Sequence, residues 1–515
     1  VITFKINGTL LSKTYASYFQ PSKGNLDSIV KNGPHSEYFE NGFKSIIKYF
    51  INNQQIGEQY TYNSNGLLIN ESTYLDGLPN GSEKIFYETG ELKFVRYNKL
   101  GTTEGQEIGY YKSGEKKLIR NYSNGKLNGK DIGYYKDGNT FYERNYISGL
   151  ISGNEIGYND SGNIIYRKEY QNPNLNMTEN DFTSNLKKIS FYYTTGEIKE
   201  EVNYENGKIT GQTNGYYKSG QKSHIFNFKN GKKQGLSETY FENGDLKSSC
   251  YFENGLKNGT EIVFEREKKD TITENEKTGL PLVKFSYNYY KSLERNYLNG
   301  YTNGIEKGYY DNGGIKYSQN WNDGLLNGKK TIFYNKEGLY LKEEYNFVNG
   351  IKNGKYLSYY DTGEIETEAD YINGIKSSLV LRYFKNRNVK SREHYSNNMK
   401  SGEWIENYES GKIKSKYNYE LNDLKGDYYK YGENNSEVIY SVNYIDGKRH
   451  GLESSYFASC QPKRDTNYLN GTKNGEEIEY YEISGNVKSK KLYKNNKIIW
   501  PVIEFYSNSG RIKSE

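Results

Sequence analysis

Polar and apolar residues alternate along short segments that recur through most of the chain. One segment reads, at every second position, Ile198, Glu200, Val202 and Tyr204, with the charged residues Lys199 and Glu201 between them. Alternate residues of a β-strand point to opposite faces. The pattern therefore predicts short strands with one half-apolar face and one charged face.

Glycines recur with the same period as these segments. One series is Gly42, Gly66, Gly90, Gly114, Gly138 and Gly162, and a second is Gly33, Gly57, Gly81, Gly105, Gly129 and Gly153, each with a step of 24 residues. Both series resume further along the chain. Because the intervening segments are short and rich in Tyr, Ile, Val and Phe, we expect two strands per period, joined as a β-hairpin.

The predicted fold is all-β. It is an elongated, single-layer, open antiparallel sheet, or β-solenoid, of about 19 tandem β-hairpin repeats of 24 residues, roughly 180 Å along its contour. We expect the two glycine series to mark two offset turns per repeat. Dipeptides such as Asn41-Gly42 and Asn65-Gly66 are expected to supply the positive φ of the first turn.

Aromatic residues follow the same period. One recurs at the eighth position after the first-turn glycine, as in Tyr122, Tyr146 and Tyr170, and adjacent pairs such as Tyr110-Tyr111 end the outgoing strand. We expect the first set to stack between hairpins and the pairs to divide between the packed layer and the second face. The repeat then carries two aromatic ladders.

Breaks in the period divide the chain. We expect a degenerate N-terminal cap at 1–30, repeats at 31–170, a loop insertion at 171–186, repeats at 187–264, a second loop insertion at 265–282, and repeats with a C-terminal cap at 283–515. The second insertion is rich in charge and is expected to be a solvated excursion.

The composition fits one continuous repeat structure better than several globular cores. Hydrophobic residues make up only 34% and the mean hydropathy is −0.98, whereas 57 tyrosines argue against disorder. The net charge of +6 is too small to indicate nucleic acid by itself. Tyrosine is expected to supply the buried surface, with its ring in the stack and its hydroxyl toward water.

No pattern of catalytic residues is present. The four histidines are far apart in sequence, and Cys250 and Cys460 lie about nine repeats apart, which excludes a disulfide between them in the predicted fold. Motifs for zinc hydrolysis, phosphate loops and serine nucleophiles are missing. We therefore expect no enzyme activity, no catalytic residue, no metal site and no cofactor.

The candidate binding face consists of the tyrosines and lysines at the end of the outgoing strand. These are Tyr111, Lys112, Tyr135, Lys136, Tyr193, Tyr217, Lys218, Tyr310 and Tyr360. A line of Tyr and Lys side chains suits a polymeric partner. The simpler interpretation is that the lysines cover aromatic faces and keep the edge soluble. Trp500-Pro501 is expected to close the core.

The string Y-x-N-G-x-x-x-G-x-x-x-x-Y-Y-x-x-G-x-x-K, for example from Tyr204 to Lys222, resembles the MORN repeat. It is closest to the bacterial variant of the YwqK-type antitoxin family, and the resemblance covers about residues 31–515. It implies a hairpin array and a role as antitoxin or immunity protein. The periodic Trp of eukaryotic MORN units is absent and the 24-residue step is slightly long, which weighs against their lipid-binding role.

These observations favour a non-catalytic scaffold for protein–protein interaction. The first alternative is a cell-surface array that binds carbohydrate or cell wall, and the second is association with membrane lipid, which is less favoured. Nucleic acid is not expected as a partner, and the oligomeric state is left open. Because the sequence begins at Val1 without an initiator Met, we favour the cell surface or secretion over the cytoplasm.

Overall fold

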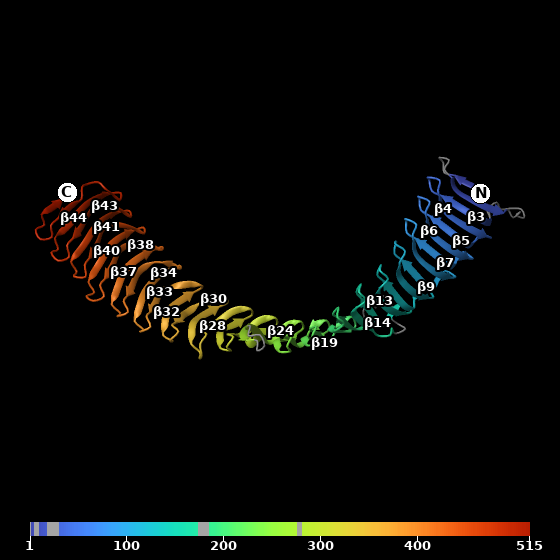
Figure 1. The fold of residues 1–515 in the computed structure, drawn as a ribbon, viewed down its shortest axis with the longest axis horizontal. Helices are drawn as coiled ribbons and strands as arrows, with labels where there is room; N and C mark the ends of the chain where they lie inside the picture. Colours follow the sequence, from blue (N-terminus) through green and yellow to red (C-terminus); the bar gives the residue numbers. More distant parts are fainter. Residues whose placement is uncertain (1, 5–9, 18–29, 174–184, 275–280, 515) are drawn as a thin grey trace. The chain divides into compact units, whose positions relative to one another are not determined.

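The fold is described from a computed structural model, which covers residues 2–4, 10–17, 30–173, 185–274 and 281–514. In these ranges the chain forms β-strands and turns and no helix. It divides into two units, Val1–Gly255 and Leu256–Glu515. In each unit, successive strands lie side by side along the chain (Figure 1).

The strands of the first unit are β1 (Ile2–Phe4), β2 (Leu10–Ser17), β3 (Val30–Tyr38), β4 (Lys44–Ile51), β5 (Gln54–Tyr62), β6 (Leu68–Leu75), β7 (Leu78–Phe86), β8 (Leu92–Lys99), β9 (Thr102–Tyr110), β10 (Lys116–Ser123), β11 (Lys126–Leu127), β12 (Gly129–Tyr134), β13 (Thr140–Ile147), β14 (Leu150–Tyr158), β15 (Ile164–Tyr170), β16 (Leu186–Tyr192), β17 (Ile198–Glu205), β18 (Lys208–Ile209), β19 (Gly211–Tyr216), β20 (Lys222–Lys229), β21 (Lys232–Lys233), β22 (Gly235–Tyr240) and β23 (Leu246–Glu253).

The strands of the second unit are β24 (Leu256–Glu274), β25 (Pro281–Leu298), β26 (Tyr301–Tyr309), β27 (Ile315–Asn322), β28 (Leu325–Phe333), β29 (Leu341–Val348), β30 (Ile351–Lys352), β31 (Gly354–Tyr359), β32 (Ile365–Ile372), β33 (Ile375–Tyr383), β34 (Val389–Ser396), β35 (Met399–Lys400), β36 (Gly402–Asn407), β37 (Ile413–Glu420), β38 (Asp423–Leu424), β39 (Gly426–Tyr431), β40 (Val438–Ile445), β41 (Lys448–Tyr456), β42 (Pro462–Leu469), β43 (Thr472–Tyr480), β44 (Val487–Lys494), β45 (Lys497–Ile498), β46 (Ile503–Phe505) and β47 (Ile512–Ser514).

Strands pair antiparallel with the strands before and after them in sequence. β9 pairs with β10, β10 with β12, β12 with β13 and β13 with β14. Each unit is thus a single open sheet of hairpins, which confirms the predicted all-β fold.

The first turn of a repeat is a three-residue loop closed by glycine. Between β9 and β10, the amide of Tyr111 donates to the carbonyl of Glu115 at 2.9 Å, and the amide of Gly114 donates to the carbonyl of Tyr111 at 3.0 Å. Gly114 has a φ of 98°. Positive φ in these turns falls on the last loop residue, because a three-residue hairpin loop needs only that residue in the left-handed region. It is usually glycine, whereas two repeats have Arg387 and Cys460 in its place. The dipeptides Asn41-Gly42 and Asn65-Gly66 supply the positive φ as expected, and they do so through their glycines, at 86° and 78°.

The second turn lies at the Asn-Gly or Asp-Gly dipeptide, before the second glycine series. Asn124 and Gly125 both have positive φ, 52° and 76°, and Ser123 pairs with Lys126 across them. This is a two-residue turn of the kind that matches the twist of the flanking strands. Gly129, with a φ of 93°, is the first residue of β12, and Asn128 separates it from β11. The second glycine series therefore marks a β-bulge and not a turn.

The segment 265–282 differs from the expected loop. β24 and β25 continue beyond the usual repeat length and pair residue by residue as far as Glu274 and Pro281. A hairpin of this kind can extend without an apolar face. The hydrogen bonds between its two strands pair the backbone N–H and C=O groups whatever the side chains are. Residues 275–280 and 174–184, and most of the predicted cap at 1–30, lie outside the described residues.

The core lies on one face of each sheet, called here the packed face. It holds the second and fourth residues after each bulge glycine and the even positions of the return strands. Val202 and Tyr146 are buried on it, as the alternation predicted. Carboxylates are buried there as well: Asp131 is 0% and Glu306 1% exposed.

Candidate interaction surfaces

The predicted tyrosines lie in the loops of the first turns and form what we call the tyrosine edge. The hydroxyl of Tyr111 donates to the carbonyl of Tyr134 in the next repeat at 2.7 Å, and that of Tyr135 donates to the carbonyl of Tyr158 at 2.9 Å. The same bond to the next repeat is made by Tyr87, Tyr193, Tyr217, Tyr310, Tyr334, Tyr360, Tyr408 and Tyr481. The hydroxyls of the candidate tyrosines are thus engaged in joining repeats.

Lysines cover the rings of the tyrosine edge. Lys117 and Lys136 place their Nζ atoms 5.6 and 5.9 Å from the ring centroid of Tyr111. Lys112 lies over Tyr87, and Lys218 over Tyr193, in the same way. The same cation–π contact recurs at many of the first turns. The lysines lie over aromatic rings at this edge, as the simpler interpretation of the sequence expected. The binding role of the nine candidate residues stays a prediction.

The local environment raises the pKa of two hydroxyls of the tyrosine edge, those of Tyr135 and Tyr360. Desolvation, with the charges of Asp160 and Asp137, raises the pKa of Tyr135. Burial, with the charge of Glu366, raises the pKa of Tyr360. Both phenols therefore remain hydrogen-bond donors to the backbone of the following repeat.

The packed face is organised around carboxylates that sequence reasoning did not single out. Each stands two residues after a bulge glycine and accepts from the return strand. Glu155 accepts from Tyr166 and Lys168 at 2.9 Å and from Tyr170 at 3.3 Å. The sequence shows that Glu155 stands two residues after Gly153, but it does not show that the carboxylate is buried.

In the first unit these carboxylates alternate with basic residues of neighbouring strands. The Nε of Arg96 lies 2.6 Å from Glu83, and that of Arg144 lies 2.8 Å from Asp131. Arg120 lies between them, 4.0 Å from Glu107 and 3.4 Å from Asp131. Opposite charges are matched along this row, so it stabilises the sheet without offering a free charge to a ligand.

A row of exposed apolar side chains runs along the second turns of the second unit. We call it the apolar edge. It consists of Leu256, Tyr301, Leu325, Ile351 and Ile375, each directly after a turn glycine and each between 42% and 63% exposed. A Cβ at the next turn glycine would approach the preceding side chain, at 3.3 Å for Gly300 and Leu256 and 3.4 Å for Gly374 and Ile351. The glycines therefore let these side chains lie against the neighbouring turns as a continuous ridge.

The same position is polar or charged in other repeats. It holds Lys208 and Lys232 in the first unit, and Asp423 and Lys448 later in the second unit. The turn geometry therefore does not demand an apolar residue there. Leu78 is also apolar and exposed at this position in the first unit, but among the described repeats an uninterrupted row of exposed apolar residues is found at 256–375. Aligning the residues that follow each Asn-Gly or Asp-Gly could have found this row.

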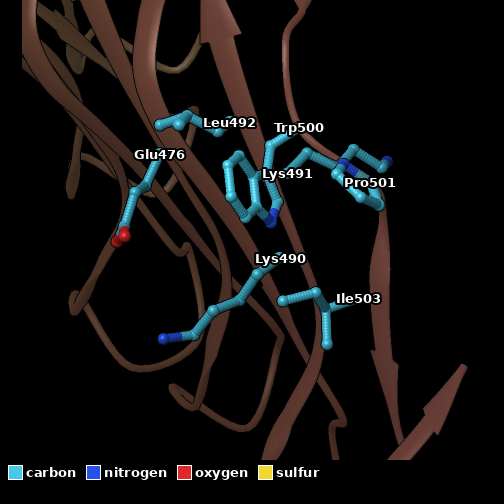
Figure 2. A pocket seen from close by; sticks show the side chains of 7 residues that line it. All are labelled: Glu476, Lys490, Lys491, Leu492, Trp500, Pro501 and Ile503. Atoms are coloured by element: carbon cyan, nitrogen blue, oxygen red, sulfur yellow. The ribbon is translucent and has the colours of Figure 1, made fainter. Parts of the chain in front are cut away.

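Trp500 lines a cavity of about 340 Å³ near the last strands of the second unit. Figure 2 shows its indole beside Leu492 and Ile503, with the side chains of Glu476 and Lys490 extending nearby. Trp500 is 60% exposed, so it does not close the core as expected. The reason is that Trp500-Pro501 interrupts the strand between β45 and β46, and the indole lies over the sheet surface.

The described part of the chain contains no group of three or more His, Cys, Asp or Glu side chains arranged to hold a metal ion. Within that same part, no helix is long and apolar enough to cross a membrane. Cys250 is a buried free thiol and Cys460 an exposed one.

The sequence profile of the MORN repeat variant family matches the chain five times, at 188–206, 233–254, 302–323, 352–373 and 400–421. Each match spans a first turn with its two flanking strands and ends where the next second turn begins. No curated protein matches the chain.

Solved structures resemble the chain only weakly. A chain of the TcdB2-TccC3-Cdc42 crystal structure is 9% identical with a TM-score of 0.13, over 98% of this chain and 30% of that one. The Tc holotoxin pore of Photorhabdus luminescens is 11% identical with a TM-score of 0.12, and the match covers 93% of this chain and 27% of that one. A porin-like protein from Bacteroides uniformis is 10% identical with a TM-score of 0.12, and the match covers 48% of this chain and 91% of that one. The chain thus spans under a third of the toxin chains, and TM-scores this low support no inference. The repeat profile and the hairpin geometry agree at the five matched segments, which are repeats of the MORN variant.

Proposed function

We propose that the chain is a non-catalytic scaffold that binds a partner protein along its apolar edge. The observation that supports this most directly is the row of exposed apolar side chains from Leu256 to Ile375, a position that is polar or charged in several other repeats. Contiguous apolar surface on a soluble protein commonly marks an interaction site.

The spacing of the row suggests the class of partner. Two strands per repeat at about 4.8 Å each place successive side chains ~10 Å apart. Seven residues of an α-helix rise about 10.5 Å. An amphipathic helix with an apolar residue at every seventh position would therefore meet each side chain of the ridge in turn.

The other surfaces offer less to a partner. The hydroxyls and rings of the tyrosine edge are engaged within the sheet, and the charges of the packed face in the first unit are paired. A role as antitoxin or immunity protein is one form that such a scaffold could take, and it remains a proposal from the family resemblance. Membrane association is an alternative outcome of the experiment below.

The test compares Ile351→Glu and Leu325→Glu with Leu469→Glu. Leu469 is also exposed, at 45%, but it lies outside the apolar edge. Proteins captured by the full chain from native lysate are quantified by mass spectrometry. We expect at least one protein to be lost with both edge variants and kept with Leu469→Glu. Capture that is the same for all variants, or binding to lipid vesicles that the edge variants abolish, would overturn the proposal.

Carbohydrate binding is a second candidate at a single site. The observation in its favour is the exposed indole of Trp500 beside Glu476 and Lys490, since an aromatic face with polar groups beside it can stack a sugar ring (Figure 2). A glycan array probed with the full chain and with Trp500→Ala tests it. A signal that Trp500→Ala leaves unchanged would exclude this site.

A further inference from the structure

A second pocket lies on the packed face of the second unit and has a different chemistry. It has a volume of about 180 Å³. Its lining consists of Tyr345, Tyr356, Thr367, Ala369, Tyr371, Lys376, Val380 and Arg382. Three phenols, a hydroxyl, an ammonium and a guanidinium thus surround one small space.

Ala369 is the reason for the space. It pairs with Tyr356 on one side and with Val380 on the other, and Ala369 and Val380 are 2% and 1% exposed. The equivalent position in other repeats holds a long side chain, such as Arg144 or Lys168. A methyl group in this place leaves a hollow above the sheet that its neighbours do not fill.

Arg382 is held at the pocket by its neighbours. Its Nε donates to Oε1 of Glu393 at 2.7 Å, and its Nη1 donates to Oγ1 of Thr367 at 3.4 Å. These two bonds fix the plane of the guanidinium. A guanidinium has five N–H donors, so donors remain for a further acceptor.

Two lysines add positive charge that no carboxylate neutralises directly. Nζ of Lys352 lies 4.1 and 5.3 Å from the ring centroids of Tyr345 and Tyr371, which line the pocket, and Nζ of Lys376 lies 4.7 Å from that of Tyr395. In the part of the chain that the structure describes, both ammonium groups contact rings and neither has a carboxylate within ion-pair distance. This region therefore differs from the charge-matched row of the first unit.

The charge of Lys352 is disfavoured in the structure as it stands. Burial lowers the pKa of Lys352, and the positive charges of Lys330 and Lys376 add to this against the opposing charge of Glu343. A negative group in the pocket would reverse the effect of the neighbouring cations.

We propose that this pocket binds a phosphate or sulfate group. A tetrahedral oxyanion has several acceptor oxygens, and the lining offers a guanidinium, an ammonium and the hydroxyls of Tyr356 and Tyr371, whereas the hydroxyl of Tyr345 already donates to Glu343. The pocket is small and lies on one face of the sheet, so it suits a single oxyanion group of a small ligand. This site is separate from the apolar edge and from the Trp500 cavity.

The test is calorimetric titration of the full chain with inorganic phosphate, with sulfate and with acetate, in a chloride buffer. The informative variant is Lys376→Gln and its matched control is Lys400→Gln. Lys400 occupies the same place one repeat later and stacks on Trp404 and Tyr419, both at 4.9 Å. Ala369→Leu, which fills the hollow, is the second variant.

We expect saturable binding of phosphate, sulfate or both. Binding should be at least tenfold weaker in Lys376→Gln, absent in Ala369→Leu, and within about twofold of the unaltered chain in Lys400→Gln. The two titrations show which oxyanion is preferred. The proposal is overturned if neither anion binds, if acetate binds as well as both, if Lys400→Gln weakens binding as much as Lys376→Gln, or if Ala369→Leu binds normally while retaining the hydrogen-exchange protection of its strands.

Discussion

Buried carboxylates are the residues on which the packed face depends most. Glu306 is 1% exposed and accepts from Arg295 at 2.5 Å, Tyr317 at 2.8 Å, Gln319 at 2.9 Å and Trp321 at 3.0 Å. One acidic residue thus satisfies four donors of the neighbouring strands. Burial, with the hydrogen bond and charge of Glu306, raises the pKa of Tyr317 to about 12.

Replacing Glu306 with Gln should destabilise its repeats strongly, because the half-buried Arg295 would lose its counter-charge. Breaking a buried pair of this kind typically costs about 3–5 kcal/mol. Hydrogen exchange of β26 and β27 would measure the loss as a lower free energy of opening. Glu337→Gln is the control, since Glu337 is exposed in a turn. Equal effects of the two substitutions would contradict this role for Glu306.

Glu83 and Glu107 should respond to acid in opposite directions. Burial opposes ionisation of Glu83, but hydrogen bonds from Arg96 and Asn98 outweigh it and lower its pKa below the ordinary 4.5. Burial raises the pKa of Glu107 above 4.5 despite the charges of Arg120 and Arg96. Glu83 therefore contributes stability above pH 4.5 that is lost as the pH falls through its folded pKa. Glu107 has the opposite sign, and its contribution is lost as the pH rises through its folded pKa.

The opening free energies of β7 to β10, measured by hydrogen exchange between pH 3 and 7, would separate the two residues. Glu83→Gln should reduce the loss of stability on the acid side. Glu107→Gln should reduce the decline in stability as the pH rises above 4.5. Slopes that neither substitution changes would show that these carboxylates do not control the acid response.

At the scale of the hairpin, the fourth residue after the bulge glycine is matched to the residue opposite. Gly133 lies under the ring of Tyr142, where a Cβ would come within 2.4 Å of Cε1. In another repeat the same position holds Thr239, whose hydroxyl lies 2.6 Å from that of Ser248 opposite. A large ring faces glycine, and a small side chain faces threonine.

This matching predicts a non-additive pair of substitutions. Gly133→Thr should destabilise β12 and β13 by roughly 2–4 kcal/mol, because the ring of Tyr142 must leave its place. Tyr142→Ser in the same chain removes the obstruction, so the double variant should lose less than the sum of the two single losses. Hydrogen exchange of both strands measures the cycle. Simple additivity would indicate that the ring moves aside without cost.

At the scale of the whole molecule, each hairpin is buried only against its neighbours, which makes the repeats replaceable units. Gly211 and Gly235 are equivalent bulge glycines, with φ of 66° and 88°, followed by the buried Thr213 and Ser237. The residues between the two glycines form one complete period.

Deletion of residues 211–234 should therefore leave the remaining strands folded. Circular dichroism should show a β-sheet signal that falls only in proportion to the number of residues removed. Hydrogen exchange should show unchanged protection of the strands away from the junction. Deletion of 12 residues, 211–222, is the control, since it removes one strand and reverses the direction of the next. Loss of structure throughout after the 24-residue deletion would contradict a repeat-by-repeat fold.

The period, the alternation and the turn dipeptides were sufficient to determine the hairpins and the open antiparallel sheet, because these depend on local geometry and on neighbours in sequence. The tertiary structure alone decided what happens between repeats. It engaged Tyr111 in a bond to the next repeat, buried Glu306, extended β24 and β25 as a long hairpin, and left the hollow at Ala369. These features depend on the volumes and charges of side chains on neighbouring strands, which are 11 to 15 residues apart for Glu306 and 23 residues apart for Tyr111. Such residues meet only when the hairpins stack, and so no single segment specifies them.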